Sequence, residues 1–451
     1  MSPLPAPLWR RFLVFLVPLM LANILQSLSG TINNIYIGQM IGVDALAAVS
    51  TFFPIMMLLI AFIIGLSAGS TVLIGQAWGA RNVDKVKEIT GTTIVVTLVL
   101  GVIVAVFGGL FAPQLMTILG APANVLDASV SYGRVMLIGM PGLFLFMMGT
   151  SVLRGVGDTM TPLYALVGSL LVGLVVTPAL IQGWFGLPQI GVMAAAVATN
   201  VGFITVLLFL FFYMRLTKNP LAPDAVLLKY LRINPDLLKL ILKLGIPAGI
   251  QMIVVSVAAI VVVGLVNRFG SDATAAYGAT NQVTSYVQFP AMSIGIAASI
   301  LAAQAIGAGQ LSEVRRITRT AMILNLTLTG GLVLLGYLFS EHLVALFITD
   351  PAVIDMTQHL LHIVLWSAIM FGWQGILAGI MRASGTVMVP MLISMGCILL
   401  IEVPLAIYLS QGPLGLGGIW WALAINFTAM FVFQGIYYWF SWTKKSIKAL
   451  I

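Results

Sequence analysis

Charged side chains are scarce in this chain of 451 residues, because Asp, Glu, Lys and Arg together account for only 8% of it. A water-soluble domain covers its surface with charge, and 60% hydrophobic residues leave too little polar surface for that. The composition therefore excludes a soluble globular protein. The mean hydropathy of +1.10 indicates that lipid is the solvent around this chain.

Cysteine and histidine are nearly absent as well. Cys397 is the single cysteine, so no disulfide can form within the chain. The three histidines, His342, His359 and His362, offer too few ligands for a metal site. The sequence also lacks the H-E-x-x-H, G-x-S-x-G and Walker-type motifs of enzymes and nucleotide-binding proteins. We therefore predict no enzyme activity, no resident cofactor and no bound metal.

Long apolar runs make up most of the chain. A bilayer core needs roughly 20 apolar residues per helix, and twelve such runs are present. They lie near residues 12–38, 46–73, 90–111, 127–152, 161–182, 189–213, 241–268, 275–303, 319–339, 356–380, 388–410 and 417–440. The sequence thus predicts an all-α polytopic membrane protein with twelve transmembrane helices.

The basic residues gather on one side of the predicted membrane protein. With twelve spans both termini share a side, and 19 of the 21 Lys and Arg residues fall on it, while Arg134 and Arg268 fall on the other. This bias predicts cytoplasmic termini and a protein integral to the cytoplasmic (inner) membrane. The net charge of +8 lies in short loops between apolar runs, so it does not indicate a nucleic-acid partner.

The most polar long stretch divides the twelve runs into six and six. It extends from Met214 to about Asp236 and contains three prolines, each after Asn or Ala, that do not continue helices. We predict an N-terminal six-helix lobe at 1–213, a cytoplasmic linker at 214–238 and a C-terminal six-helix lobe at 239–451.

The two halves repeat at a fixed offset of 228 residues. The matching places are Asp44-Ala45 with Asp272-Ala273, Gln76-Ala77 with Gln304-Ala305, Ile89-Thr90 with Ile317-Thr318, and Arg154, Gly157 and Pro162 with Arg382, Gly385 and Pro390. One offset at four separated places is hard to obtain by chance. Because each half has six helices, corresponding helices cross the membrane in the same direction. We therefore predict two pseudo-symmetric lobes related by an axis along the membrane normal, an arrangement of secondary transporters.

These segments resemble the multidrug and toxic compound extrusion (MATE) family over essentially the whole chain. The similar segments are Asn33 to Gly38 with Ala45 to Val49, Gly75 to Ala80, Leu153 to Thr159 followed by Pro162, and Leu244 to Pro247 at the opening of the seventh helix. The resemblance implies two lobes around a central cleft, which rock between inward-open and outward-open states. It also implies export of bulky, often cationic compounds, coupled to inward flow of protons or sodium ions.

This sequence departs from the family at the residues that couple transport to an ion. Many members carry an Asp in helix 1, where this chain has Asn33. The sodium-linked branch carries a Glu in helix 7 and an Asp in helix 10, where alignment places Val255 and Phe371. The resemblance therefore leaves the coupling ion open between H+ and Na+.

Glu402 is the only acidic residue well inside a predicted span, and it is our candidate for ion coupling. At 1.5 Å per residue it lies about 21 Å from the helix start at Met388 and about 12 Å from Ser410 at the other boundary. An ionised carboxylate at that depth is costly unless it is paired or wet, so it favours the protonated form and could carry a proton. The alternative is a protonated Glu that joins two helices and has only a structural role.

Polar residues on the predicted helices 1 and 8 are candidates for the lining of a substrate cleft. Helix 1 carries Asn33 and Asn34, and helix 8 carries Asn281, Gln282, Ser285 and Tyr286. Such groups are not left facing lipid, so they line a wet cavity or join helices. Trp373 could add an aromatic face for a flat cation, although packing in the core is the commoner role of such a ring.

The leading interpretation is a secondary active multidrug exporter that antiports bulky neutral or cationic compounds against protons or sodium ions. Its partners would be small-molecule drugs or toxic compounds and the lipid bilayer, and it would function as a monomer. A flippase for lipid-linked sugars is the alternative transporter, although such proteins line their cleft with cations, and here the membrane interior holds almost no basic residue. A membrane-embedded enzyme and a passive channel are alternatives from other classes.

Overall fold

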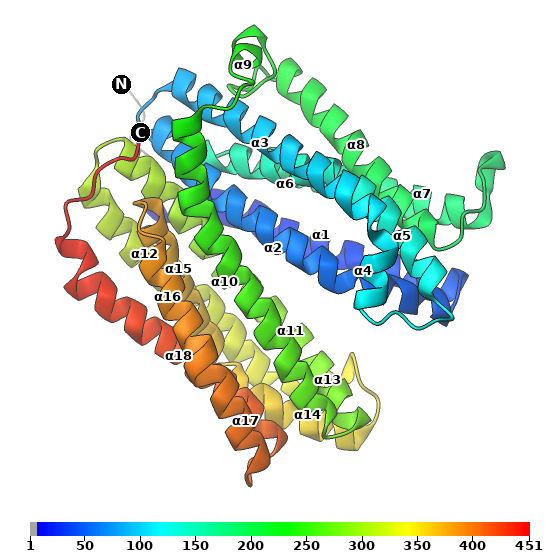
Figure 1. Cartoon of the computed structure of the whole chain (residues 1–451). Helices are drawn as coiled ribbons and strands as arrows, with labels where there is room; N and C mark the ends of the chain where they lie inside the picture. Colours follow the sequence, from blue (N-terminus) through cyan, green and yellow to red (C-terminus); the bar gives the residue numbers. More distant parts are fainter. Residues whose placement is uncertain (1–6) are drawn as a thin grey trace. The chain divides into compact units, whose positions relative to one another are not determined.

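The computed structural model describes residues 7–451, except for the side chain of Val43. The described residues form α-helices joined by short loops, and no strand occurs among them (Figure 1). The nine uninterrupted long helices are α1 (Leu8–Met40), α2 (Val43–Gly79), α3 (Val83–Leu110), α7 (Met160–Gln182), α8 (Met193–Leu216), α10 (Pro235–Asn267), α11 (Ser271–Gly307), α12 (Leu311–Leu338) and α18 (Leu416–Phe440). A tenth, Met388–Gln411, consists of α16 (Met388–Cys397), the π-helix η2 (Ile398–Glu402) and α17 (Val403–Gln411).

Two further spans are bent pairs of helices. The pair α5 (Leu126–Ile138) and α6 (Met140–Gly155) bends by 48°, and the pair α14 (Pro351–Val364) and α15 (Ser367–Ala383) bends by 40°. By length and composition the described residues thus contain ten helices able to cross a membrane, or up to twelve when each bent pair is one span. This confirms the predicted all-α fold, and each of the twelve predicted apolar runs falls on one of these spans. Pro141 explains the first bend, since it has no backbone N–H to continue the helix.

The structure adds short helices that the apolar runs did not indicate. They are α4 (Ala112–Ile118), η1 (Trp184–Gly186), α9 (Ala225–Lys229), α13 (Ser340–Ala345) and η3 (Trp442–Lys444). The helix of the seventh predicted span also begins earlier than expected. The sequence placed its opening at Leu244 to Pro247, but α10 starts at Pro235. Asn234 explains this start, because its side-chain oxygen accepts hydrogen bonds from the first turn's backbone N–H groups and Pro235 suits the first helical position.

Contacts divide the chain into two compact units. The N-terminal unit holds residues 21–74 and 82–246, and the C-terminal unit holds the preceding part of α1, residues 75–81 and residues 247–451. Long helices therefore contribute to both units, since α1, α2 and α10 each have one part in either unit. The predicted division at 1–213, 214–238 and 239–451 stays a prediction, and its residues 1–6 lie outside the described part of the chain.

The C-terminal unit is built around α11, most of which is buried. It packs against α12 and α15, and α15 packs in turn against α18 (Figure 1). Small residues such as Ala298 and Ala302 let these helices approach closely, as helices in lipid require. Phe12 and Leu16 from the start of α1 are buried in the same core.

Two glycines at helix ends make a reciprocal contact inside this unit. A Cβ on Gly79, the last residue of α2, would lie 1.9 Å from the backbone oxygen of Gln304. A Cβ on Gly307, the last residue of α11, would lie 1.9 Å from the backbone oxygen of Gln76. Gly79 and Gly307 are 228 residues apart, as are Gln76 and Gln304. Equivalent segments of the two sequence repeats therefore contact each other here. Only glycine fits at either position.

The N-terminal unit packs α3 against α6 and α7 against α8, and part of the linker is tied to it. Lys87 of α3 forms an ion pair with Asp224, and the neighbouring Glu88 accepts a hydrogen bond from Asn234 at 2.7 Å. The Asp224 side chain also accepts from the backbone N–H of Leu227, and so caps α9. The Lys87 ammonium, followed by this backbone hydrogen bond, lowers the pKa of Asp224. The linker is thus fastened to the start of α3 by charge and by hydrogen bonds.

Candidate functional site

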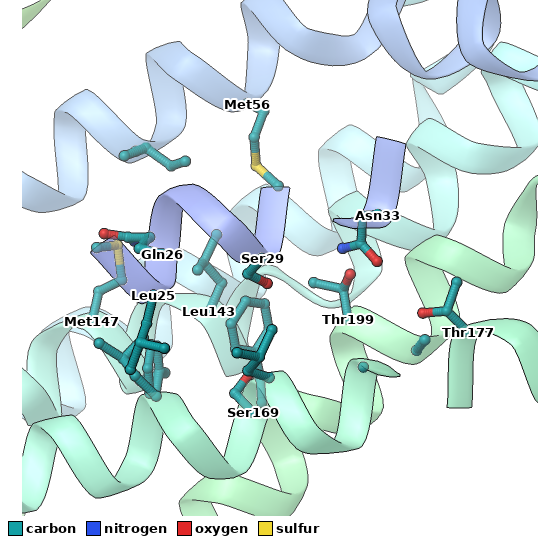
Figure 2. Close-up of a pocket in the computed structure, with 17 residues that line it drawn as sticks. Leu25, Gln26, Ser29, Asn33, Met56, Leu143, Met147, Ser169, Thr177 and Thr199 are labelled. Atoms are coloured by element: carbon teal, nitrogen blue, oxygen red, sulfur yellow. The ribbon is translucent and has the colours of Figure 1, made fainter. Parts of the chain in front are cut away.

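A cavity of about 180 Å³ lies within the N-terminal unit, between α1, α2, α6, α7 and α8 (Figure 2). Its lining residues are Leu25, Gln26, Ser29, Asn33, Met56, Ile60, Leu143, Phe146, Met147, Leu166, Ser169, Leu170, Gly173, Thr177, Ala198, Thr199 and Phe203. Gln26, Ser29 and Asn33 follow one another at helical spacing, so they present one face of α1 to the cavity. Figure 2 shows this face with Thr177 and Thr199 of the neighbouring helices around the same space.

None of the seventeen residues that line this cavity is charged. Amides and hydroxyls supply its hydrogen-bonding groups, while Met56 and Met147 supply flexible thioethers and Phe146 and Phe203 supply aromatic rings. Thr177 is fully buried, and its hydroxyl has no hydrogen-bond partner among the described residues. A few polar groups in an apolar cavity are typical of small-molecule sites, and thioethers adapt to ligands of different shape.

Of the two helix 1 candidates, Asn33 lines this cavity and Asn34 does not. The Asn34 side chain is exposed instead. The cavity also contains polar residues that the sequence analysis missed, among them Ser169, Thr177 and Thr199. Each is a single hydroxyl within a long apolar helix, and such isolated residues carry no periodic signal that would set them apart.

The candidates on the predicted helix 8 lie together on α11 in the C-terminal unit. Asn281, Gln282 and Ser285 are half-buried, and the Ser285 hydroxyl donates to the backbone oxygen of Asn281 at 2.8 Å. Tyr286 is 38% exposed, and its ring meets Phe289 edge to face at 5.6 Å. None of these four residues lines the cavity of the N-terminal unit. Their part in a substrate cleft stays a prediction.

Trp373 is held within the C-terminal unit by contacts on two sides. Its indole Nε1 donates to the backbone oxygen of Met322 on α12 at 3.1 Å, and its ring lies 5.1 Å from that of Phe431 on α18. Its role in drug binding stays a prediction, since these contacts describe packing between α12, α15 and α18. The neighbouring Phe371, which stands where the sodium-linked branch has an acid, packs against Phe427.

Glu402 is buried inside the C-terminal unit, with 8% of its surface exposed. It ends η2, and its carboxylate accepts a hydrogen bond from Nδ2 of Asn426 on α18. Among the described residues no ion pair involves Glu402. The described polar partner of this carboxyl group is therefore an amide N–H donor and not a cation.

The helix around Glu402 departs from the α-helical pattern. In η2 the backbone N–H of Val403 donates to the oxygen of Ile398, five residues back, so the turn is wider than an α-helical turn. Pro404 follows and has no N–H of its own, which leaves a backbone carbonyl in the preceding turn without its helical donor. Single π-helical turns within α-helices are frequently found at functional sites. Here it surrounds the only acid that the sequence analysis placed deep in the membrane.

Buried polar groups without partners lie on the helices next to Glu402. The oxygen of Asn426 and the indole N–H of Trp420, both on α18, have no hydrogen-bond partner among the described residues. Tyr277 on α11 packs against Trp420 with ring centroids 5.3 Å apart and the ring planes tilted by 34°. Tyr277 also interacts electrostatically with Glu402 and forms a hydrogen bond with Asn281. This polar cluster links the candidate on η2 to one of the candidates on α11. Asn426 was missed because it is a single amide in an apolar run, although a buried Glu requires such a partner.

A model of the MatE family matches residues 18–179 and again residues 247–408, which together exceed half of the chain. The chain belongs to the MatE family. The two matches start 229 residues apart, within one residue of the offset at which the sequence repeats. Family membership and the helical content make this an integral membrane transporter of two related halves, as predicted.

Known proteins similar to this chain agree with that membership. A Bacillus subtilis protein named as a probable multidrug resistance protein, YoeA, is 44% identical over 98% of this chain and 96% of its own length. The Staphylococcus aureus multidrug export protein MepA is 24% identical over 93% of this chain and 91% of its own length. The crystal structure of a Vibrio cholerae MATE transporter mutant superposes with a TM-score of 0.89 at 20% identity, covering 98% of both chains, which shows the same fold.

Proposed function

We propose that this MatE-family protein is a multidrug efflux transporter that exchanges bulky neutral or cationic compounds for protons by alternating access. The observation that carries the proposal is a buried carboxyl group, Glu402, inside a membrane-spanning segment of a chain from this family. The names of its relatives, a multidrug resistance protein and a multidrug export protein, support drugs as the substrates.

The uncharged cavity of the N-terminal unit supports the substrate class. Apolar walls with amides and hydroxyls suit a neutral or singly charged organic compound, and they offer no ion pair to an anion. Asn33 and the polar residues of α11, namely Asn281, Gln282, Ser285 and Tyr286, would contact the compound along its path. Trp373 would contribute an aromatic edge.

Glu402 would supply the coupling. In the buried state its carboxyl group holds a proton, because ionisation away from water is costly. A cationic compound or a wetter conformation favours the ionised form and releases the proton. Binding of the proton and binding of the compound then weaken each other, because both act on the same carboxyl group. This is the thermodynamic linkage that exchange requires. Sodium would need several oxygen ligands, whereas the described partner of this carboxylate is an N–H donor.

The proposal also covers the location in the membrane, the two lobes and the oligomeric state. The protein would lie in the cytoplasmic membrane with both termini and the linker inside, since that places 19 of 21 basic residues on the cytoplasmic side. The lobes would be 1–213 and 239–451, joined by the linker at 214–238. The chain would act as a monomer, because both halves of the family repeat are present in it.

The proposal is tested by reconstituting the purified full-length chain in liposomes and measuring dye export under a proton gradient and a sodium gradient, imposed separately. We expect export with the proton gradient alone. Glu402→Gln should fold, insert and lose at least about 90% of proton-driven export, whereas Glu402→Asp should keep part of it. The matched control is Glu341→Gln, which neutralises an exposed acid on α13 and should export at the parental rate.

Three results would contradict the proposal, each at a different part of it. Export by Glu402→Gln at the parental rate with unchanged pH dependence would remove the coupling role of Glu402. Export driven by sodium alone would remove the proton as coupling ion. Absence of dye export under both gradients, for a folded protein, would count against multidrug efflux itself.

A further inference from the structure

We propose that Asn426 is the positioning residue through which Glu402 exchanges its proton, because its amide can bind the carboxyl group in both protonation states. This inference rests on the proposed function, since it assigns a working partner to the proposed proton carrier. In the structure Nδ2 of Asn426 donates to Oε2 of Glu402, and this donor suits the ionised carboxylate as well as the carbonyl oxygen of the protonated acid. A half-turn of the amide would present its oxygen instead, which suits the O–H of the protonated acid.

The Asn426 amide uses only one of its two polar atoms, so both of its orientations toward Glu402 are open to it. Asn426 is 1% exposed, and its Oδ1 has no partner among the described residues. Asn325 in the same unit shows the structural case, since its Nδ2 donates to the oxygen of Ile369 and its Oδ1 accepts from Thr329. Both atoms of Asn325 are occupied, so its amide has one orientation. In Asn426 either orientation makes one hydrogen bond to Glu402 and leaves one amide atom unpaired.

Glu402 and Asn426 can therefore form one hydrogen bond with each other whether Glu402 is ionised or protonated. A carboxyl group away from water favours its neutral form, because ionisation there is costly without a hydrogen-bond donor. The amide donor offsets part of that preference by stabilising the ionised form, and the amide oxygen keeps a partner for the acid. Glu402 ends the π-helical turn at Ile398–Glu402, so the backbone beside this carboxyl group departs from α-helical hydrogen bonding.

Other titratable groups near the pair are few in the described part of the chain. Tyr277 of α11 interacts with Glu402 electrostatically. Cys397 precedes η2 and is buried beside Ala258 of α10 and Met430 of α18. The side chains that α10 contributes there, Val254 and Ala258, are apolar. Asn426 is therefore the polar group in direct hydrogen-bonding contact with the acid.

The experiment measures the protonation of Glu402 directly. A hydrophobic carbodiimide reacts with protonated buried carboxyl groups, so mass spectrometry of the labelled peptide from the reconstituted full chain, across a pH series, gives the midpoint of the Glu402 titration. The adduct that is absent from the Glu402→Gln variant is the one formed on Glu402. Export of dye under a proton gradient is recorded across the same pH series.

Asn426→Leu removes the donor while keeping similar volume. A hydrogen bond to a charged group is worth more than one to a neutral group, so the ionised form loses more. We expect the labelling midpoint to rise by about one pH unit and the pH profile of export to move the same way. Asn426→Gln keeps the amide and should fall between the parent and Asn426→Leu. If Asn426→Leu does not fold, Asn426→Ala gives the same comparison.

Gln434→Leu is the matched control. Gln434 is also a fully buried amide of α18, its Nε2 donates to Ser394 of α16 at 3.0 Å, and its Oε1 likewise has no described partner. It should leave the midpoint unchanged. An unchanged midpoint in Asn426→Leu, or an equal shift in Gln434→Leu, would overturn the inference. The proposed function would survive that result if Glu402→Gln still abolished proton-driven export.

Discussion

At the scale of single residues, glycine sets the closest contact between helix ends in the C-terminal unit. Gly79 and Gly307 each face the backbone oxygen of a glutamine from the other half of the repeat. A backbone atom cannot swing aside as a side chain can, so an added methyl group must move a helix end. The contact therefore constrains two positions that look unremarkable in sequence, since each is one glycine among 45.

We predict that Gly79→Ala and Gly307→Ala each lower stability by about 3 kcal/mol or more, because overpacking against backbone is costly. Thermal unfolding of the purified protein in detergent measures this as a lower midpoint. Gly331→Ala is the control, because a Cβ at this position of α12 meets no atom within 4 Å. It should be neutral or slightly stabilising, as Ala favours helix. Equal melting of all three variants would contradict the packing argument.

A second residue-scale prediction concerns the charge of the cavity in the N-terminal unit. Asn33→Asp places an acid among lining residues that are all uncharged. The acid should attract cations, so export of a cationic dye should rise severalfold relative to that of a neutral dye of similar size. Asn34→Asp, on an exposed side chain outside the cavity, is the control and should leave this ratio unchanged. A similar change of the ratio in both variants would show that the cavity does not discriminate by charge.

At the scale of elements, the linker is held to α3 partly by a titratable ion pair. The Asp224 carboxylate is 43% exposed and pairs with Lys87, which lowers its pKa. Because the folded pKa lies below the unfolded value of about 3.9, the stabilisation is complete above that pH and is lost as the pH falls through the folded pKa. Hydrogen exchange of the amides in α9 reports whether the linker is attached.

We predict that Asp224→Asn speeds exchange in α9 at neutral pH and weakens its acid dependence, since the charge of Asp224 is gone while Glu88, which accepts a hydrogen bond from Asn234, remains. In the parent protein α9 should loosen only in acid. Asp236→Asn neutralises an exposed acid twelve residues along, outside any described ion pair, and should exchange like the parent. Unchanged exchange in Asp224→Asn would mean that the capping and apolar contacts of the linker suffice to hold it.

The elements also show which features a single sequence reveals. A span of about 20 apolar residues is set by bilayer thickness, so length alone located all twelve spans. The helices α4 and α13 have seven and six residues and no such length signal. The π-helical turn at Ile398–Glu402 was not foreseen either, because an apolar run does not indicate where a helical turn widens.

The residues of the candidate site likewise divide into those that the sequence reveals and those that it does not. Glu402 could be named from sequence because a lone acid in an apolar run stands out, and Asn33 because the family comparison marks its position. Asn426, Thr177 and Thr199 could not, since they are ordinary polar residues whose meaning comes from what faces them across a helix boundary. Hydrogen-bond partners between distant helices are a property of the tertiary structure.

At the scale of the whole molecule, the orientation in the membrane is open to a direct test. Cys397 is the only cysteine, so a Cys397→Ala background makes single-cysteine variants simple to read. We predict that Lys218→Cys and Ser446→Cys react with a membrane-impermeant maleimide only after cells are opened, because both lie on the basic side. Phe185→Cys, at a side chain 93% exposed, should react in intact cells. Reaction of all three variants from outside would refute the twelve-span orientation.

The division of α1 and α10 between the two compact units bears on how such a protein could have arisen. The start of α1 packs in the unit dominated by the C-terminal half, and residues 235–246 of α10 pack in the unit dominated by the N-terminal half. An ancestor with one half would have needed a second copy to receive the end of its first helix, so it would have been an obligate dimer with exchanged ends. Duplication and fusion of its gene would then have made a dimer of two chains into one chain. Neither half, cut at the linker and expressed alone, would hold its own complete core.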